Sequence, residues 1–149
     1  MPEKQTLRRA RKAKRAGKAP STQAGEFVRE EIHHVREGKH GARSTKQAIA
    51  IGLSKARRSG VNLGRAPASA QRSTKKRAAS ATKAGRSRKK TSRRRSQAVR
   101  RTLKRERRSV VSRKALSRQA RTAARRRPAS ARKTAARKAA RTRKRRASA

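Results

Sequence analysis

The sequence predicts an all-α protein, in which a small helical hairpin is flanked by a basic N-terminal arm and by a long basic tail that is largely disordered or conditionally helical. Two observations lead to this prediction. Apolar residues recur at helical spacing in residues 21–63, which also hold four of the six acidic residues. The whole chain has 149 residues, a formal net charge of +45 and only 30% hydrophobic residues, so a core cannot extend along its full length.

The first helix of the hairpin is expected to begin at Ser21 or Thr22 and to end at Gly38. Steps of four, four and three residues define its inward stripe, which is Ala24, Val28, Ile32 and Val35. The opposite side carries Glu26, Glu30 and Glu37. We therefore expect one face of this helix to meet a core and the other, acidic face to meet solvent or a cationic partner.

The second helix is expected to begin with a capping box, because Ser44 is followed three residues later by Gln47. Its inward stripe is Ile49, Gly52, Leu53 and Ala56. Gly60 is placed to end it. The resulting core is marginal, so the hairpin needs a third helix or a second copy of the chain, and a homo-oligomer through the hairpin is one expectation. A helix-turn-helix is the natural comparison, but the turn is longer than usual and we expect no sequence-specific readout.

The loop between the two helices, GKHGARSTK, leads into the backbone amides that begin the second helix. Those amides, the hydroxyls of Ser44 and Thr45 and the charges of Lys39, Arg43 and Lys46 are candidates to converge on one phosphate. An ordinary capped turn with solvated charges is the alternative, and the sequence leaves both open.

The first 63 residues resemble a known family. The run MPEKQTLRRARKAKRAGKAPSTQAGEFVREEI and the phrase GKHGARSTKQAIAIGLSKAR are similar to a family of small basic bacterial proteins that is classed as a domain of unknown function and often labelled DNA-binding. This resemblance implies a bacterial source and DNA as a partner, and it assigns no functional residues. Beyond residue 63 the chain resembles linker-histone-like bacterial proteins and protamines in composition alone.

The sequence outside the hairpin divides into four basic segments: an arm at 1–20, a disordered linker at 64–96, a conditional helix at 97–127 and a histone-like tail at 128–149. In the third segment Val99, Leu103 and Val110 recur at helical spacing, and Pro128 supplies a stop. Because high charge density opposes this helix, we expect it to form when phosphates neutralise the charge.

The charge balance predicts a nucleic-acid partner. Residues 64–149 contain 35 Lys and Arg residues against Glu106 alone, so counterion release would drive binding to phosphates. The expected function is sequence-nonspecific binding and compaction of duplex DNA by a histone-like, nucleoid-associated protein in the bacterial cytoplasm. The alternative is an RNA- or ribosome-associated basic protein, since phosphate contacts look alike on both polymers. The one aromatic residue, Phe27, offers no platform for stacking on single-stranded bases.

The candidate nucleic-acid-binding residues are basic or hydroxyl side chains of the arm, the hairpin and the tail. They are Arg8, Arg9, Arg11, Lys12, Lys14, Arg15, Lys39, Arg43, Ser44, Thr45, Lys46, Lys55, Arg57, Arg58, Arg93, Arg94, Arg95, Arg125, Arg126, Arg127, Arg143, Lys144, Arg145 and Arg146.

Other classes of function find less support in the sequence. The chain has no Asp and no Cys, and no catalytic set emerges, so we expect no enzyme and no cofactor. His33 and His34 would point about 100° apart on a helix, so solvent-exposed histidines are expected rather than a metal site. No segment pairs a basic face with a substantial apolar one, which argues against a membrane partner.

Overall fold

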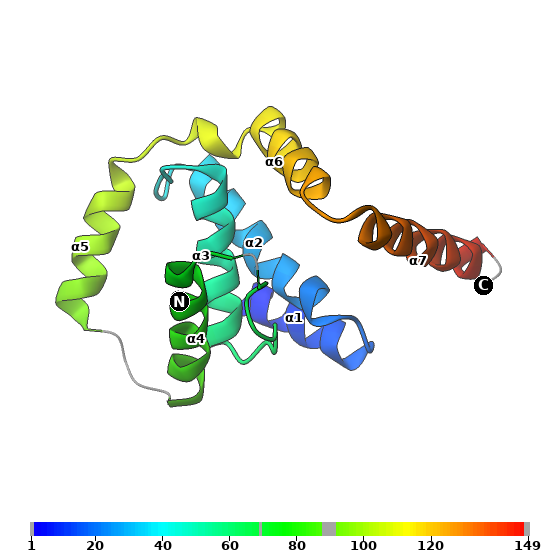
Figure 1. Ribbon diagram of the computed structural model, residues 1–149. Coiled ribbons are helices and arrows are strands. Elements are labelled where there is room, and N and C mark those ends of the chain that lie inside the picture. The colour runs from blue at the N-terminus through cyan, green and yellow to red at the C-terminus, as the bar shows by residue number, and fades with distance from the viewer. Residues whose placement is uncertain (1, 69, 88–91, 148–149) are drawn as a thin grey trace. The chain divides into compact units, whose positions relative to one another are not determined.

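In the computed structural model, residues 2–68, 70–87 and 92–147 are described, and they form helices with no strand among them (Figure 1). The elements in chain order are α1 (Lys4–Arg15), α2 (Pro20–Arg36), α3 (Thr45–Arg58), α4 (Arg72–Ser87), α5 (Arg93–Lys104), a 3-10 turn η1 (Ser109–Val111), α6 (Arg113–Arg125) and α7 (Ala129–Ala147). The chain divides into two compact units, Met1–Ser112 and Arg113–Ala149. The predicted all-α class is therefore confirmed.

Helices α2 and α3 form the predicted helical hairpin. They approach closely at Gly52, where an added Cβ would lie 2.6 Å from the Cα of Val28. Gly38, which follows α2, and Gly60, which follows α3, have φ angles of 77° and 85°, in the left-handed region that glycine adopts without strain. The Ser44 hydroxyl accepts a hydrogen bond from the Gln47 amide at 3.2 Å and so caps α3 as expected.

The N-terminal arm supplies the third helix that the hairpin needs. Helix α1 packs on α2 and buries Thr6, Ala10 and Ala13, which lie on one side of the helix. Where α1, α2 and α3 meet, the first core cluster consists of Ala10, Ala24, Phe27 and Ala56, with Leu7, Leu53, Val61 and Leu63 packed against it. Small alanines thus let the three helices close around one fully buried phenylalanine.

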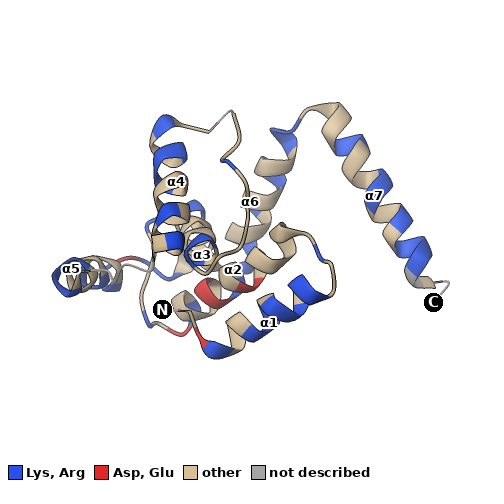
Figure 2. Cartoon of the chain, turned by 90° about the horizontal axis from the view of Figure 1, so that it is seen from below, with Lys and Arg blue, Asp and Glu red and all other residues tan. Residues whose placement is uncertain are grey.

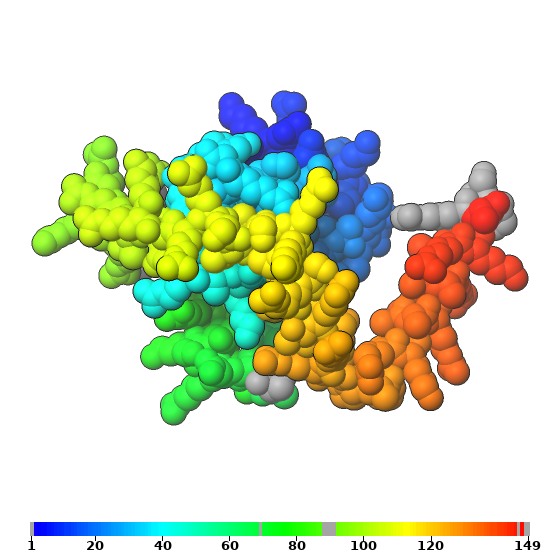
Figure 3. Space-filling model, turned by 90° about the horizontal axis from the view of Figure 1, so that it is seen from above, coloured from blue at the N-terminus to red at the C-terminus, as the bar shows by residue number. Residues whose placement is uncertain are grey.

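A segment far along the chain closes the other end of the hairpin. We call residues 103–111 the strap. It supplies Val111 to a second core cluster with Val35, Ala42 and Ala48, all four of which are 0% exposed. Figure 3 shows the strap, in yellow-green to yellow, lying across the cyan surface of the loop between α2 and α3. This strap interrupts the single helix expected over residues 97–127, since α5 ends at Lys104 and α6 begins at Arg113.

The expectation of a largely disordered basic tail is not supported. Within the predicted linker, α4 packs on α3, with Ala81 buried. Gly85 permits this packing, because an added Cβ would lie 2.7 Å from the carbonyl oxygen of Arg57. Ala-rich composition gives the segment enough helix propensity, and the neighbouring helix supplies the apolar contact that its own sequence does not reveal. The parts of the predicted linker at 69 and 88–91 lie outside the described residues.

The second unit, taken by itself, contains α6 and α7, separated by a short connection that includes Pro128. Proline restricts the residue before it, which explains why α6 ends at Arg125 and a new helix begins at Ala129. The described side chains of α7 are exposed throughout. The histone-like tail is therefore helical in this structure and offers its basic side chains to solvent.

Candidate nucleic-acid interface

Helix α1 separates its basic side chains from its buried ones. Thr6, Ala10 and Ala13 face α2 and are buried. All six candidate residues of this helix are exposed: Arg8, Arg9, Arg11, Lys12, Lys14 and Arg15. Figure 2 marks the Lys and Arg positions in blue along the ribbon of α1. The arm is thus an amphipathic helix whose apolar side is used for folding and whose cationic side is available to a polyanion.

The loop between α2 and α3 does not bring its donors to one anion. The amide of Gly41 donates to the carbonyl of Leu103 at 2.7 Å, and the amide of Ala42 donates to the carbonyl of Arg107 at 3.1 Å. The Thr45 hydroxyl donates to the carbonyl of Val110 at 2.6 Å. Of the donors predicted to bind a phosphate, the Thr45 hydroxyl is therefore satisfied by the strap, which also pairs with two amides of the loop before it. This favours an ordinary capped turn over a phosphate site.

The other candidates of this loop divide into internal and exposed ones. The Arg43 guanidinium lies 3.6 Å from Glu106 Oε1 but is 80% exposed. The amide of Arg43 donates to Gln47 Oε1 at 2.7 Å, a variation on the capping box in which Gln47 would have reached Ser44. The Lys39 ammonium lies 3.0 Å from Glu37 and 3.5 Å from Glu3. Ser44 and Lys46 are exposed at the start of α3 and keep access to solvent.

The candidate residues at the end of α3 divide into internal and exposed ones. The Lys55 ammonium lies 2.6 Å from Glu31 Oε2 and 3.3 Å from Glu30 Oε1, so its charge is used inside unit 1. Arg57 donates to the carbonyl of Gly64 at 3.2 Å, and Arg58 is exposed. Of these three residues, Arg58 has the placement that phosphate binding requires.

Helices α5, α6 and α7 carry the other candidates. No residue of α5 or α6 is buried, and Arg93, Arg94 and Arg95 lie exposed in the first turn of α5. Arg125, Arg126 and Arg127 are exposed at the end of α6 and just beyond it. Arg143, Lys144 and Arg145 are exposed near the end of α7, whereas the side chain of Arg146 lies outside the described part of the chain.

The acidic face expected on α2 is wrong for Glu30, which is buried rather than solvated. Glu30 is 5% exposed and its neighbour Glu31 is 0% exposed, because α1 and α3 cover this side of α2. Glu30 accepts a hydrogen bond from the backbone amide of Glu3 at 3.2 Å, and both carboxylates pair with Lys55. Figure 2 shows this red patch on α2. The error arose because the partners of Glu30 are 25 and 27 residues away in sequence.

Two of the three histidines join the same region. His34 and His40 have side chains only 14% and 16% exposed, which corrects the expectation of solvent-exposed histidines at these positions. His34 Nε2 lies 2.8 Å from Glu3 Oε1, and His40 Nε2 lies 3.2 Å from Glu31 Oε1. His33 is exposed, as expected. The i, i+3 spacing of Glu31 and His34 is the sequence signal for this cluster, and Glu3 has no local signal.

Two groups at the surface of this region titrate away from their ordinary values. The hydrogen bond with His34, followed by the Lys39 contact, lowers the pKa of the Glu3 carboxyl. The hydrogen bond with Glu37 raises the pKa of the Lys39 ammonium, and Glu3 adds to this effect. Both shifts favour the charged forms and maintain the ionic contacts at neutral pH.

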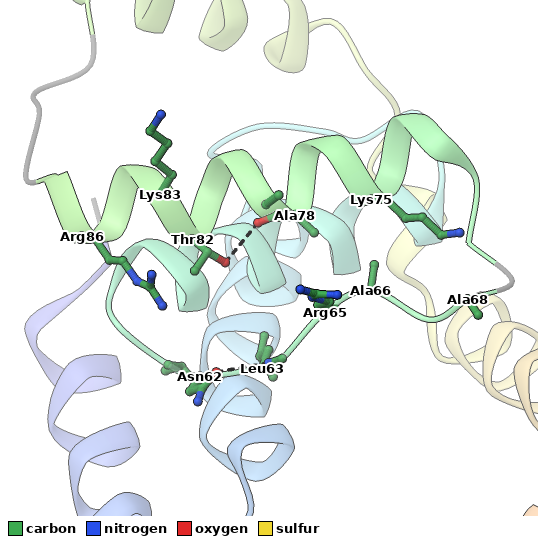
Figure 4. A pocket seen from close by; sticks show the side chains of 13 residues that line it. Asn62, Leu63, Arg65, Ala66, Ala68, Lys75, Ala78, Thr82, Lys83 and Arg86 are labelled. Atoms are coloured by element: carbon green, nitrogen blue, oxygen red, sulfur yellow. Dashed lines mark hydrogen bonds between the residues drawn. The ribbon is translucent and has the colours of Figure 1, made fainter.

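A cavity of about 970 Å³ lies between α4 and the segment of residues 61–68 (Figure 4). Its lining is rich in small apolar side chains, with Val61 and Leu63 from the segment and Ala78 from α4. The labelled basic side chains around it are Arg65, Lys75, Lys83 and Arg86. No acid, histidine or cysteine is among its described lining residues.

Comparisons with protein-family models, with curated proteins and with solved structures found no match to this chain. None of the described helices is both long enough and apolar enough to cross a membrane.

Proposed function

We propose that this protein binds duplex DNA without sequence preference through phosphate contacts and compacts it, as a histone-like, nucleoid-associated protein. One observation carries the proposal: most of the acids are ion-paired within the chain, whereas the basic side chains of the arm and the tail are mostly exposed. The chain has 51 Lys and Arg residues and six acids, and four of those acids belong to one internal network around α2. The exposed cations of the arm and the tail therefore have few acidic partners within the chain and suit an external polyanion.

One face of α6 illustrates how such a helix would contact phosphates. A groove along this face, about 420 Å³ in volume, is lined by Lys114, Ser117, Arg118, Arg121, Thr122 and Arg125. From Lys114 to Arg125 the helix rises about 16 Å, at about 1.5 Å per residue. Duplex DNA carries roughly ten phosphates over the same length, so four cations at this spacing can each find a phosphate on one strand or the other. Guanidinium groups add bidentate geometry to these contacts.

The burial of Phe27 favours duplex over single-stranded nucleic acid. Single-strand binders stack bases on exposed aromatic side chains, and the chain's one aromatic residue is 0% exposed in the first core cluster. The contacts left to the protein are electrostatic ones to the backbone, which bind any sequence. Because both compact units carry exposed cations, one chain has the means to contact two duplexes, which is what compaction requires.

The salt dependence of binding tests this mechanism. We expect the variant with Lys114, Arg118, Arg121 and Arg125 all changed to Gln to reduce the slope of log K against log salt by about 3.6, at about 0.9 per lost phosphate contact. The matched control changes Ser117 and Thr122 on the same face to Ala and leaves the slope unchanged. Fluorescence anisotropy with a labelled random duplex measures both, and equal slopes for all three proteins would contradict the proposal.

Crosslinking in cells, with the bound DNA and RNA sequenced separately, tests which polymer is the partner. The proposal expects recovery of DNA across the whole chromosome with little RNA. Recovery concentrated on ribosomal RNA would reject the nucleoid role and make the ribosome-associated alternative the working model.

A further inference from the structure

We propose that Glu31, His34 and His40 form a binding site for one divalent transition-metal ion, for which Zn²⁺ is the best match. The ligand atoms of the three residues, one carboxylate oxygen and one ring nitrogen from each histidine, all lie within 4.8 Å of one another. A tetrahedral zinc ion with bonds of about 2.0 Å places neighbouring ligand atoms about 3.3 Å apart. The His40 Nε2 to Glu31 Oε1 distance is already 3.2 Å. Small side-chain rotations therefore suffice to enclose an ion.

Secondary structure holds the three residues in place. Glu31 and His34 are three residues apart on α2, so they lie on the same side of the helix. Gly38, with its φ of 77°, reverses the chain after α2 and brings His40 back to that side. The site thus combines two ligands from a rigid helix with one from the loop that the strap covers. The ring of His34 contacts the ring of His40. Its sequence neighbour His33 has an exposed side chain and is not part of the site.

The two carboxylate oxygens of the buried Glu31 differ in their surroundings, since one lies against the Lys55 ammonium and the other faces His40. Its side chain is 0% exposed, and neither carboxylate oxygen accepts a hydrogen bond of good geometry. The Lys55 ammonium lies close to Oε2, at 2.6 Å, which leaves Oε1 directed at His40. A buried carboxylate without hydrogen bonds is costly, and a metal ion bound through Oε1 would remove that cost. The Lys55 contact to Oε2 would then orient a carboxylate that binds the ion through a single oxygen.

The ring of His40 is also oriented so that its Nε2 can bind a metal ion. Its Nδ1 lies 3.0 Å from the carbonyl oxygen of Gly41, which requires a proton on Nδ1. In the neutral ring the Nε2 lone pair then faces Glu31 Oε1 at 3.2 Å, and either a proton or a metal ion between the two atoms would remove their repulsion. A ring nitrogen that donates to a backbone carbonyl while the other nitrogen binds metal is the usual arrangement of a histidine ligand.

The local charge also suits a divalent cation. The network around the site contains four carboxylates, those of Glu3, Glu30, Glu31 and Glu37. Among the described residues, the ammonium groups that pair with them are those of Lys39 and Lys55. Carboxylates thus outnumber ammonium groups in this network, which favours a further cation. Imidazole ligands favour zinc and its transition-metal neighbours over Mg²⁺ and Ca²⁺, which prefer oxygen ligands alone.

The test measures Zn²⁺ binding to the full chain in chelator-free buffer, by competition with a chromophoric chelator. We expect one bound ion per chain, and at least a tenfold loss of affinity in His34→Ala and in His40→Ala. The matched control is His33→Ala, which removes an exposed histidine from the same helix and leaves the affinity unchanged. Absence of chelator-competing Zn²⁺ binding by the unmodified chain, or an equal loss in the control variant, overturns the proposal.

A second measurement needs no variant and so does not depend on how substitutions fold. Co²⁺ added to the unmodified chain is expected to develop the intense visible absorption of four- or five-coordinate cobalt, and one equivalent of Zn²⁺ is expected to abolish it. A spectrum that stays that of the hydrated ion would show that the three residues do not form a metal site. Because neither readout involves nucleic acid, the metal site and the proposed DNA binding stand or fall separately.

Discussion

Gly52 sets how closely the two helices of the hairpin approach. Its missing side chain lets the backbone of α3 lie against the backbone of α2, since an added Cβ would be 2.6 Å from the Cα of Val28. Gly25, in α2, has nothing within 4 Å of an added Cβ. The two residues are both helical glycines, so they differ in surroundings and not in backbone conformation.

Alanine substitutions at these two glycines are expected to have opposite effects on stability. Gly52→Ala should lower the free energy of unfolding by about 1–3 kcal/mol, because backbone atoms of α2 must move to admit the methyl group. Gly25→Ala should raise it by about 0.5–1 kcal/mol, through the better helix propensity of alanine. Urea denaturation followed by circular dichroism measures both. Equal effects would show that the helices are not in close contact at Gly52.

Lys55 is predicted to be a structural residue rather than a DNA contact. Lys55→Met would leave the buried carboxylates of Glu30 and Glu31 without their cation, and we expect a loss of about 3 kcal/mol in the free energy of unfolding. The control Lys46→Met, on the exposed side of the same helix, should change it by less than about 0.5 kcal/mol. The same denaturation experiment compares them, and equal stabilities would remove the internal role of Lys55.

Several residues whose role is local were predicted from the sequence, and residues whose role depends on distant partners were not. The expected cap at Ser21 or Thr22 was wrong, because α2 begins at Pro20, with Ala19 as its N-cap and no side-chain cap. Ser44, Gly38 and Gly60 act on the helix ends beside them, so their spacing alone indicated the caps. Glu30 was assigned to a solvated face because helical spacing shows which side of a helix a residue occupies, but not what another helix brings to that side. Its partner Lys55 is 25 residues away.

Among the elements, the strap was the one that sequence periodicity could not reveal. Val99, Leu103 and Val110 share helical spacing, but the chain leaves the helix after Lys104 and turns through η1 at Ser109–Val111. Arg36 holds this turn by donating to the carbonyl of Val111 at 3.1 and 3.2 Å. The strap therefore depends on contacts that span about 75 residues, for which a local pattern holds no information.

A valine pair tests whether the strap contributes to stability. Val111→Ala removes two methyl groups from the second core cluster, where the side chain is 0% exposed, and should cost about 2 kcal/mol. Val99→Ala, at a position 54% exposed on α5, should cost less than about 0.5 kcal/mol. Thermal unfolding of the two variants gives the comparison. If Val111→Ala were as stable as the control, the strap would not be part of the cooperative fold.

For the whole molecule, the net charge of +45 is the dominant physical constraint. Cations on neighbouring helices repel one another, and the few internal ion pairs cannot balance this repulsion. Composition alone leads to this expectation. It did not predict that alanine-rich basic segments are helical, because it gave repulsion too much weight and tertiary contacts, such as those of α4, too little.

Added salt is therefore expected to stabilise the fold. The Debye length falls from about 30 Å at 0.01 M salt to about 10 Å at 0.1 M, which screens repulsion between separate helices more than it weakens short, partly buried ion pairs. The melting temperature from circular dichroism should rise over this range of sodium chloride concentration. A fall would mean that the internal ion pairs outweigh the repulsion between cations.

The strap also has a consequence for biosynthesis. Ribosomes add about 5–20 residues per second, so after Arg58 completes α3 the nascent chain waits about 3–10 s before Val111 is made. During that interval Val35, Ala42 and Ala48 lack the Val111 side chain that completes their core cluster. A basic nascent chain that emerges beside ribosomal RNA would thus contact that RNA before the strap packs against the hairpin.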